Sequence, residues 1–429
     1  MARTIKVDYL ARVEGEGALT IRFKGNEVRS VELRIFEPPR FFEAFLRGRS
    51  RLEVPDITAR ICGICPVAYQ MSSCHAIEQA AGVRVEGALR DLRRLLYCGE
   101  WIESHALHIF LLHAPDFLGY PDAVAMAREH REHVQRGLGI KKVGNSIVEL
   151  LGGRAIHPIN VRVGGFHRAP DRSELERLLP GIDSAIEALP NTARWISGFP
   201  FPDFERDYEF VALRHPGEYP VNEGRIVSSR GIDIELADFE STFEEYQVPY
   251  SNALQSRVRG RGEYFAGPLA RFNLNFERLS EPAKTLAREL GLRAPCTNPF
   301  RGILVRTVEV FHALHEARRI IRGYERPERA CVDLPTLAAT GHGCTEAPRG
   351  LLYHRYKVSQ DGLVEDAKIV PPTSQNQLCM EGDLRSIGGR LASLPAAEAT
   401  HLAEQTVRNY DPCISCATHF LELRREEDA

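Results

Sequence analysis

Two pairs of cysteines, one near each end of the chain, have the spacing C-x-x-C. Cys62 and Cys65 lie in the segment RICGICPVAYQ, and Cys413 and Cys416 lie in the segment DPCISCATHF. A single C-x-x-C pair could be a redox dithiol, two small buried hydrophobic residues or half of a structural zinc site. Neither pair identifies a function by itself.

The separation of the two pairs argues against a local zinc finger, because zinc ribbons and fingers usually take their ligands from one short stretch. Here most of the chain lies between the pairs. Closing so long a loop makes sense only if the pairs meet at the centre of a large folded body. We therefore expect four thiolates to bind one buried soft metal, and zinc, copper(I), nickel and iron all fit that ligand set.

The residues around the cysteines resemble the large catalytic subunit of nickel-iron hydrogenases. That family has R-x-C-G-x-C near its N-terminus and D-P-C-x-x-C-x-x-H at its end, and residues 60–65 and 411–419 match these patterns. Two more family motifs occur here, RVEGEG at residues 12–17 and EAPRG at residues 346–350. The four motifs follow the family's order, so the resemblance covers nearly the whole chain.

The resemblance implies a nickel-iron centre in which iron carries carbon monoxide and two cyanides. By this likeness Cys62 and Cys413 would be terminal nickel ligands, and Cys65 and Cys416 would bridge nickel to iron. A terminal thiolate keeps a lone pair free to accept a proton, which agrees with the assignment. We expect the other six cysteines to be core residues.

Three further roles come from the resemblance. Glu14 would receive a proton from Cys413, and Arg349 would lie over the open metal face and donate to one cyanide. Thr373 resembles the hydroxyl residue that binds the other cyanide, with Ser374 as the alternative, because the segment IVPPTSQN departs from the commoner family wording. From residue type alone, Glu14 could be a solvated loop carboxylate and Arg349 a surface ion-pair partner.

The resemblance also implies a site for a hard cation, usually magnesium. Glu43, His419 and the main-chain carbonyl of Ile369 would be its ligands. Without the resemblance, the spacing around Glu43 fits a charged residue on the outer face of an amphipathic helix nearly as well as it fits a cation ligand.

Some positions depart from the commonest family pattern. Tyr69 stands where the family often has a histidine four residues after the second cysteine, Ser104 replaces an acidic residue, and Glu16 replaces a histidine. These departures resemble the cytoplasmic hydrogenases whose multi-subunit complexes exchange electrons with NAD or NADP.

The implied activity is the heterolytic cleavage of dihydrogen. The remaining cysteines form no iron-sulfur run, and no glycine-rich loop after a strand offers a dinucleotide site. We therefore expect an iron-sulfur small subunit and, beyond it, flavin-containing NAD(P) diaphorase subunits. The alternatives are a hydrogen-sensing regulatory subunit and a non-catalytic scaffold like the related subunit of respiratory complex I. That relative has lost the cysteines, whereas all four are present here.

Residues 420–429 follow the histidine at which family members are trimmed, and they carry six charges. Unpaired charges are costly to bury. We expect this tail to be a maturation extension that an endopeptidase removes after nickel chaperones have loaded the metal.

The composition is that of a globular protein, with 43% hydrophobic and 26% charged residues among 429. The formal net charge of −3 gives no basic excess for nucleic acid or anionic lipid. The sequence has neither a signal-peptide pattern at its start nor an apolar run long enough for a membrane span. We expect a cytoplasmic protein.

The predicted strands and helices indicate an α+β, mainly helical fold in one unit over residues 1–429. The resemblance implies that this is the fold of the nickel-iron hydrogenase large subunit. A small antiparallel sheet within about residues 1–40 is predicted from strands at 5–9, 19–23 and 28–36 with a Lys24-Gly25-Asn26 turn.

Long helices dominate the prediction for the middle of the chain. One runs from Leu89 to a breaker at Pro115, and another spans 298–322 with Asn298 as its cap and Pro299 in its first turn. The proline-bearing stretches at 190–202 and 216–220 indicate surface loops or an insertion boundary. Both metal-binding ends would meet in this helical body.

Overall fold

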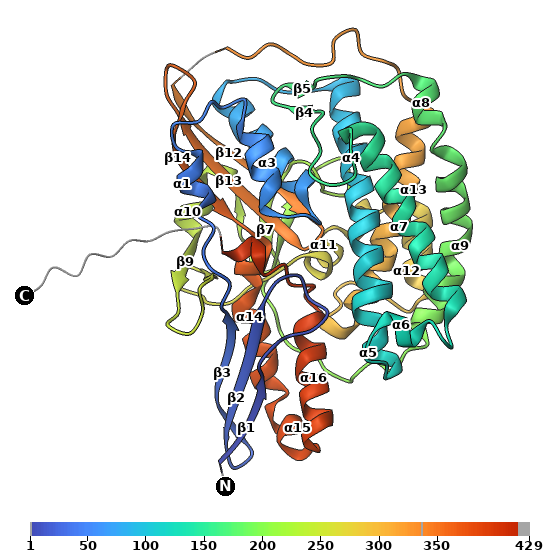
Figure 1. The fold of residues 1–429 in the computed structure, drawn as a ribbon, viewed down its shortest axis with the longest axis vertical. Coiled ribbons are helices and arrows are strands. Elements are labelled where there is room, and N and C mark those ends of the chain that lie inside the picture. Colours follow the sequence, from blue (N-terminus) through green and yellow to red (C-terminus); the bar gives the residue numbers. More distant parts are fainter. Residues whose placement is uncertain (1, 336–337, 419–429) are drawn as a thin grey trace, which may run out of the picture.

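The computed structural model describes residues 2–335 and 338–418, so the predicted ligand His419 and the predicted tail lie outside the described residues. At one end of the molecule (Figure 1), three antiparallel strands form a sheet in the order β1 (Ala2–Val7), β2 (Gly17–Lys24) and β3 (Glu27–Ile35). Lys24 pairs with Glu27, and Gly25 adopts a φ of 64° in the turn between them. The predicted N-terminal sheet is confirmed.

Long helices fill the right-hand side of the molecule in Figure 1: α4 (Gly87–Ala106), α7 (Arg131–Gly152), α9 (Leu179–Ser197) and α13 (Gly302–Arg322). Helix α4 packs against α7 and α13, and α13 packs against α9. Ahead of α13, the Asn298 side chain accepts the N–H of Phe300 at 2.9 Å, as its predicted capping role requires.

Two expectations about proline are wrong. The helix does not stop at Pro115, because a π-helical stretch (Leu107–His113) leads into α5 (Ala114–Leu118) and the chain turns only at Gly119. Pro115 lies in the first turn of α5, where no helical hydrogen bond needs its missing N–H. Pro190 lies inside α9, whose buried face, including Leu189, outweighs the lost hydrogen bond. Residues 198–202 and 216–220 form loops, as predicted, but Tyr219 and Pro220 are buried and do not lie on the surface.

A second antiparallel sheet consists of β12 (Ala339–Ala347), β13 (Gly350–Val358) and β14 (Val364–Val370), and α3 (Pro66–Ala80) lies directly on β12 and β13. Glycines permit this close approach: a Cβ on Gly343 would lie 2.2 Å from the carbonyl oxygen of Ser72. Because α3 begins immediately after Cys65, this sheet fixes the position of the first cysteine pair.

The C-terminal part runs through α14 (Pro372–Ser386), α15 (Gly388–Ser393) and α16 (Ala396–Arg408) beside the N-terminal sheet, and it then enters the centre of the molecule (Figure 1). The other elements are α1 (Phe42–Leu46), α2 (Val54–Thr58), α6 (Ala123–Met126), β4 (Val161–Arg162), β5 (Gly165–Phe166), α8 (Arg172–Glu176), β6 (Phe210–Arg214), β7 (Arg225–Ser228), β8 (Asp233–Ile234), α10 (Phe239–Thr242), β9 (Phe243–Gln247), β10 (Leu254–Val258), β11 (Phe265–Ala266), α11 (Pro268–Asn275) and α12 (Glu281–Glu289).

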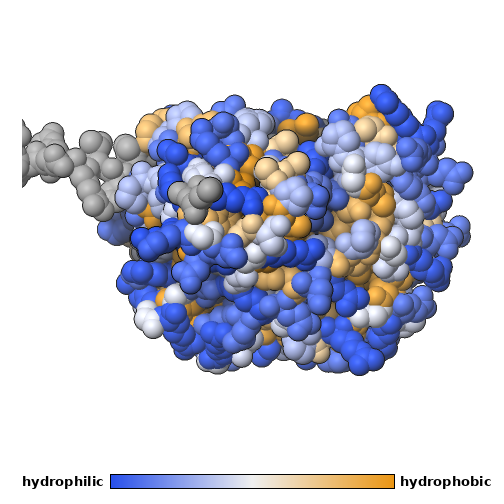
Figure 2. All heavy atoms as spheres, turned by 90° about the horizontal axis from the view of Figure 1, so that it is seen from below, coloured by the Kyte–Doolittle hydropathy of each residue, from blue (hydrophilic) through white to orange (hydrophobic). Residues whose placement is uncertain are grey.

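The surface seen in Figure 2 is mostly hydrophilic, with smaller hydrophobic areas between the polar side chains. Within the described ranges, no helix is long and apolar enough to cross a bilayer. Of the six cysteines outside the two pairs, five are buried and Cys331 is half-buried, so the core expectation holds for five of them.

Candidate metal centre

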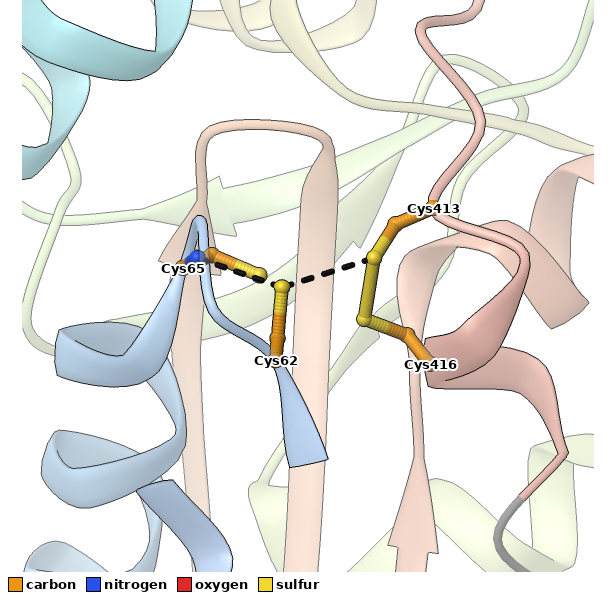
Figure 3. A group of neighbouring side chains, drawn as sticks. All are labelled: Cys62, Cys65, Cys413 and Cys416. Atoms are coloured by element: carbon orange, nitrogen blue, oxygen red, sulfur yellow. Dashed lines mark hydrogen bonds between the residues drawn. A yellow bond between two sulfur atoms is a disulfide. The ribbon is translucent and has the colours of Figure 1, made fainter. Parts of the chain in front are cut away.

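The structure brings the two cysteine pairs together. The sulfur atoms of Cys62, Cys65, Cys413 and Cys416 all lie within 4.8 Å of one another (Figure 3), and each residue is at most 3% exposed. Cys62 follows a short 3-10 turn, Cys65 precedes α3, and the other pair comes from the loop after α16. Among the described residues, no other group of three or more His, Cys, Asp or Glu side chains converges in this way.

The sulfur of Cys62 accepts backbone hydrogen bonds and also lies close to a sulfur of the second pair. Cys62 Sγ accepts the backbone N–H groups of Ile64 at 3.3 Å and Cys65 at 3.2 Å, and it lies 3.5 Å from Cys413 Sγ. The side-chain hydrogen bond between Cys62 and Cys65 lowers the pKa of Cys62 and raises that of Cys65. Cys413 and Cys416 are joined as a disulfide (Figure 3). A soft metal binds thiolates, so loading this site requires that pair in its reduced form.

Glu14 contacts the second cysteine pair from the loop between β1 and β2. Its Oε2 lies 3.1 Å from Cys413 Sγ and accepts the N–H of Ser415 at 3.1 Å, while its carbonyl accepts the N–H of Ile414 at 2.9 Å. The neighbouring Gly15 lies close against the second cysteine segment, since a Cβ there would lie 2.8 Å from Ile414 Cβ. Its φ of 88° also favours glycine. The half-buried Glu14 is therefore held with its carboxylate beside a candidate ligand.

Arg349 lies in the turn between β12 and β13 and is 2% exposed. Its Nε donates to the carbonyl of Asp411 at 2.6 Å, and its Nη2 donates to Asp411 Oδ1 at 3.1 Å. Its Nη1 is buried and has no partner in the part of the chain that the structure describes. The charge of Arg349 acts on both Cys62 and Cys65, where it lowers the pKa, so the guanidinium lies near the cluster.

The two predicted hydroxyl residues differ in what they already bind. Thr373 Oγ1 accepts the backbone N–H of Cys413 at 2.9 Å and so supports the cysteine loop. Ser374 Oγ is buried without a partner among the described residues. Both lie in the first turn of α14.

The predicted cation ligands Glu43 and Ile369 are neighbours. Glu43 lies in the short helix α1, and its Oε1 accepts the backbone N–H of Ile369 in β14 at 2.8 Å. The third predicted ligand, His419, is outside the described residues.

Arg40 and Asp411 have positions at the site that sequence reasoning did not assign. Arg40 Nη2 donates to the carbonyl of Ile61 at 2.7 Å and also to that of Ser415, so one side chain ties the two cysteine segments together. Nothing in the local sequence distinguishes Arg40 from a surface arginine. Asp411 had a signal in its place before Pro412, but its contact with Arg349 appears only in three dimensions.

The site fits a metal that carries hydrogen-bond-accepting ligands. Four sulfurs converge from two distant segments, which is the donor set of a soft metal. Around them Arg349 Nη1, Ser374 Oγ and the Tyr69 hydroxyl are buried donors left without partners by the described part of the protein. An unsatisfied buried donor costs free energy, and acceptor ligands on a metal would satisfy it.

Comparisons with known proteins agree with this geometry. A profile of the nickel-dependent hydrogenases matches residues 40–138 and 278–419. Sulfhydrogenase 2 subunit alpha of Pyrococcus furiosus is 36% identical over 98% of this chain and 100% of its own length. The NAD-reducing hydrogenase HoxS subunit beta of Cupriavidus necator is 26% identical over 98% of this chain and 96% of its own. A crystal structure of an NAD+-reducing [NiFe]-hydrogenase in the H2-reduced state superimposes with a TM-score of 0.86, with 27% identity over 97% of this chain and 99% of that one.

Proposed function

We propose how the cysteine site of this chain works. The chain belongs to the nickel-dependent hydrogenase family, as the catalytic large subunit of a nickel-iron hydrogenase. In the proposal, Cys62 and Cys413 would hold nickel alone, and Cys65 and Cys416 would hold both nickel and an iron with carbon monoxide and two cyanides. The convergence of the four sulfurs within 4.8 Å is the observation that carries the assignment. When bound, this centre supplies the heterolytic cleavage of dihydrogen.

The chain's own part in turnover begins with a proton. Cys413 is the sulfur beside Glu14, and the 3.1 Å separation between Cys413 Sγ and Glu14 Oε2 is within reach of direct proton transfer. We infer that Glu14 takes the proton from Cys413 and passes it outward, since Glu14 is partly exposed and the cysteines are not.

In this proposal Arg349 and one of the two hydroxyl residues would donate to the iron's cyanides. Arg349 Nη1 and Ser374 Oγ are buried without a partner in the described residues. Thr373 Oγ1 accepts the N–H of Cys413 and so holds the Cys413 loop, and its hydroxyl proton can still be donated to a cyanide, with Ser374 as the alternative donor. Because Arg349 stays charged and is fixed by Asp411, it also supplies a positive field at the metals.

A hard divalent cation, magnesium by family likeness, is proposed at Glu43, the carbonyl of Ile369 and His419. Support comes from the bond that brings Glu43 and Ile369 together in space from distant parts of the sequence. Carboxylate and carbonyl oxygens suit such a cation.

The electrons must leave this chain. The described residues hold one convergent group of metal-ligand side chains, so the chain offers no second cluster for electron transfer within those ranges. We propose that electrons pass to an iron-sulfur small subunit and then, through flavin-containing diaphorase subunits, to NAD(P) in the cytoplasm. The NAD-reducing hydrogenase among the relatives supports this direction. A maturation endopeptidase and nickel chaperones are proposed as assembly partners.

A hydrogen sensor with the same metal site is the second candidate, and turnover separates the two. The enzyme purified with its native partners should reduce NAD+ or NADP+ under dihydrogen, and a redox dye should be reduced as well. Dye reduction without nucleotide reduction would remove the NAD(P) link alone. A complex that binds nickel yet turns over dihydrogen only at a trace rate would favour the sensor.

A further inference from the structure

Arg271, on α11, binds the backbone just ahead of Arg349. Its Nη1 donates to the carbonyl of Ala347 at 2.7 Å, and its Nη2 donates to the carbonyl of Pro348 at 3.0 Å. The residue is fully buried. These two carbonyls are the last ones before Arg349. The guanidinium of Arg271 therefore binds the turn that places Arg349 near the cysteines.

All five N–H donors of the Arg271 side chain form hydrogen bonds. Besides the two carbonyls, Arg271 donates to both oxygens of Glu309 at 2.8 Å and to Glu346 Oε2 at 3.0 Å. The guanidinium also lies over the ring of Trp101, 4.3 Å from its centroid, and Trp101 Nε1 donates to the carbonyl of Glu346 at 2.9 Å. All five N–H groups are thus bonded, and two carboxylates compensate the buried charge.

The partner carboxylate is itself fixed. Glu309 Oε2 lies 2.9 Å from His105 Nε2, and Glu309 Oε1 accepts the hydroxyl of Tyr219 at 2.7 Å. Burial lowers the pKa of His105 to about 4, so at neutral pH the ring is uncharged and donates from Nε2. Arg271 is therefore anchored to α4 and α13, the long helices of the fold.

The other side of the same turn touches α11. Gly267, immediately before α11, has a φ of 118°, and a Cβ there would lie 2.7 Å from the carbonyl oxygen of Arg349. The backbone of Arg349 is confined between Gly267 and the Arg271 contacts, while Asp411 holds its guanidinium. Of the Arg349 guanidinium, Nη1 is then the nitrogen without a partner among the described residues.

We propose that Arg271 is a positioning residue for Arg349: by holding the carbonyls of Ala347 and Pro348 against the long helices, it sets where Arg349 Nη1 meets the iron ligands. The inference rests on the role proposed above for Arg349. A lysine at position 271 keeps the charge but has three donors on one compact ammonium, so it cannot hold two carbonyls and two carboxylates in this geometry.

The test uses the complete enzyme with its native partners and compares Arg271→Lys with Arg93→Lys. Arg93 is a matched control because it is equally buried and pairs with both oxygens of Glu78 at 2.8 and 2.6 Å, but it does not contact the turn at Arg349. Nickel and iron content and the infrared bands of the iron-bound ligands are measured with turnover. Arg271→Lys should retain the metals, shift the cyanide bands and lose about 10- to 100-fold in kcat, as expected of a displacement near 1 Å. Arg93→Lys should leave the bands in place.

Unshifted bands in metal-loaded Arg271→Lys would overturn the inference, as would an equal shift in Arg93→Lys. If Arg271→Lys does not fold, Glu309→Gln decides, because it weakens the hold on Arg271 without touching the Arg349 turn. A smaller shift of the same bands in that variant supports positioning, and wild-type bands contradict it. Absence of such bands from the unmodified enzyme would overturn the proposed function, and this inference with it.

Discussion

Single residues at this site gain their roles from partners that lie far away in the sequence. Arg40 is an example, since it joins the carbonyls of Ile61 and Ser415 and its own N–H bonds the carbonyl of Thr418 at 2.6 Å. The cysteines, Glu14 and Arg349 could be predicted because their motifs are distinctive. The choice between Thr373 and Ser374 could not be predicted, because adjacent hydroxyls look alike in the sequence. The structure adds that Thr373 Oγ1 accepts the N–H of Cys413.

The proton relay can be tested by Glu14→Gln. The amide keeps the shape of the side chain but cannot take up and return a proton, so hydrogen-deuterium exchange should fall by about a hundredfold or more while the infrared bands stay nearly unchanged. Glu16→Gln is the matched control, because this neighbour is exposed and its backbone N–H bonds Glu37 Oε1. Exchange at the normal rate in Glu14→Gln would place the relay elsewhere.

Glu103 makes stability depend on pH. The side chain is nearly buried, and burial raises its pKa to about 8 despite Lys141 Nζ at 3.9 Å. A carboxyl whose pKa is higher in the folded state than in the unfolded chain stabilises the fold below the unfolded pKa. That contribution is lost as the pH rises toward 8.

Glu103→Gln should therefore stabilise the protein more at high pH than at low pH. Between about pH 6 and about pH 9 the advantage of the variant should grow by about 2 to 3 kcal/mol. Calorimetric Tm values at the two pH values measure it, with the exposed Glu132→Gln on α7 as control. An equal Tm difference at both pH values would show that Glu103 titrates normally.

At the scale of elements, the hydrophobic and turn patterns predicted the N-terminal sheet and α13, because hairpin turns and helix caps are local signals. They failed at Pro115, which lies in the first turn of α5 where its missing N–H is not needed, and at Pro190, where the buried face of α9 keeps the helix going. The packing of α3 on β12 was not predicted either, since it depends on glycines whose partners lie far away in the sequence.

The glycine contact between α3 and β12 leads to a prediction for Gly343→Ala. The added Cβ would lie 2.2 Å from the carbonyl oxygen of Ser72 and 2.7 Å from the backbone nitrogen of Ala76, so α3 must move, and Cys65 with it. We expect a loss of about 2 kcal/mol in stability and a reduced nickel content, measured by Tm and elemental analysis.

Gly139→Ala in α7 is the control for that variant. A Cβ at Gly139 meets nothing within 4 Å, and alanine in a helix is favoured over glycine by up to about 1 kcal/mol, so Tm should stay or rise. Unchanged Tm and nickel content in Gly343→Ala would show that α3 is not held by this contact.

At the scale of the whole molecule, the two cysteine pairs meet because two parts of the fold bring them to the same place. One part is the sheet of β12, β13 and β14, which carries α3 and Arg349. The other is the path through α14 and α16 that delivers Cys413 and Cys416 to the centre. The meeting of the pairs could be inferred from their spacing and family likeness, whereas the supporting network of Arg271, Glu309 and Asp411 required the structure.

The nickel-iron assignment is tested most directly by an infrared spectrum of the enzyme purified with its native partners, recorded beside the Cys413→Ser variant. Metal-bound carbon monoxide and cyanide absorb in a window free of protein bands. A hard alkoxide replaces a soft thiolate poorly, so the variant should lose nickel and hydrogen uptake. We expect one carbon monoxide band and cyanide bands in the unmodified enzyme, and neither bound nickel nor hydrogen uptake in the variant. A nickel-loaded, mature enzyme without these bands, or a Cys413→Ser variant that keeps nickel with full activity, would contradict the assignment.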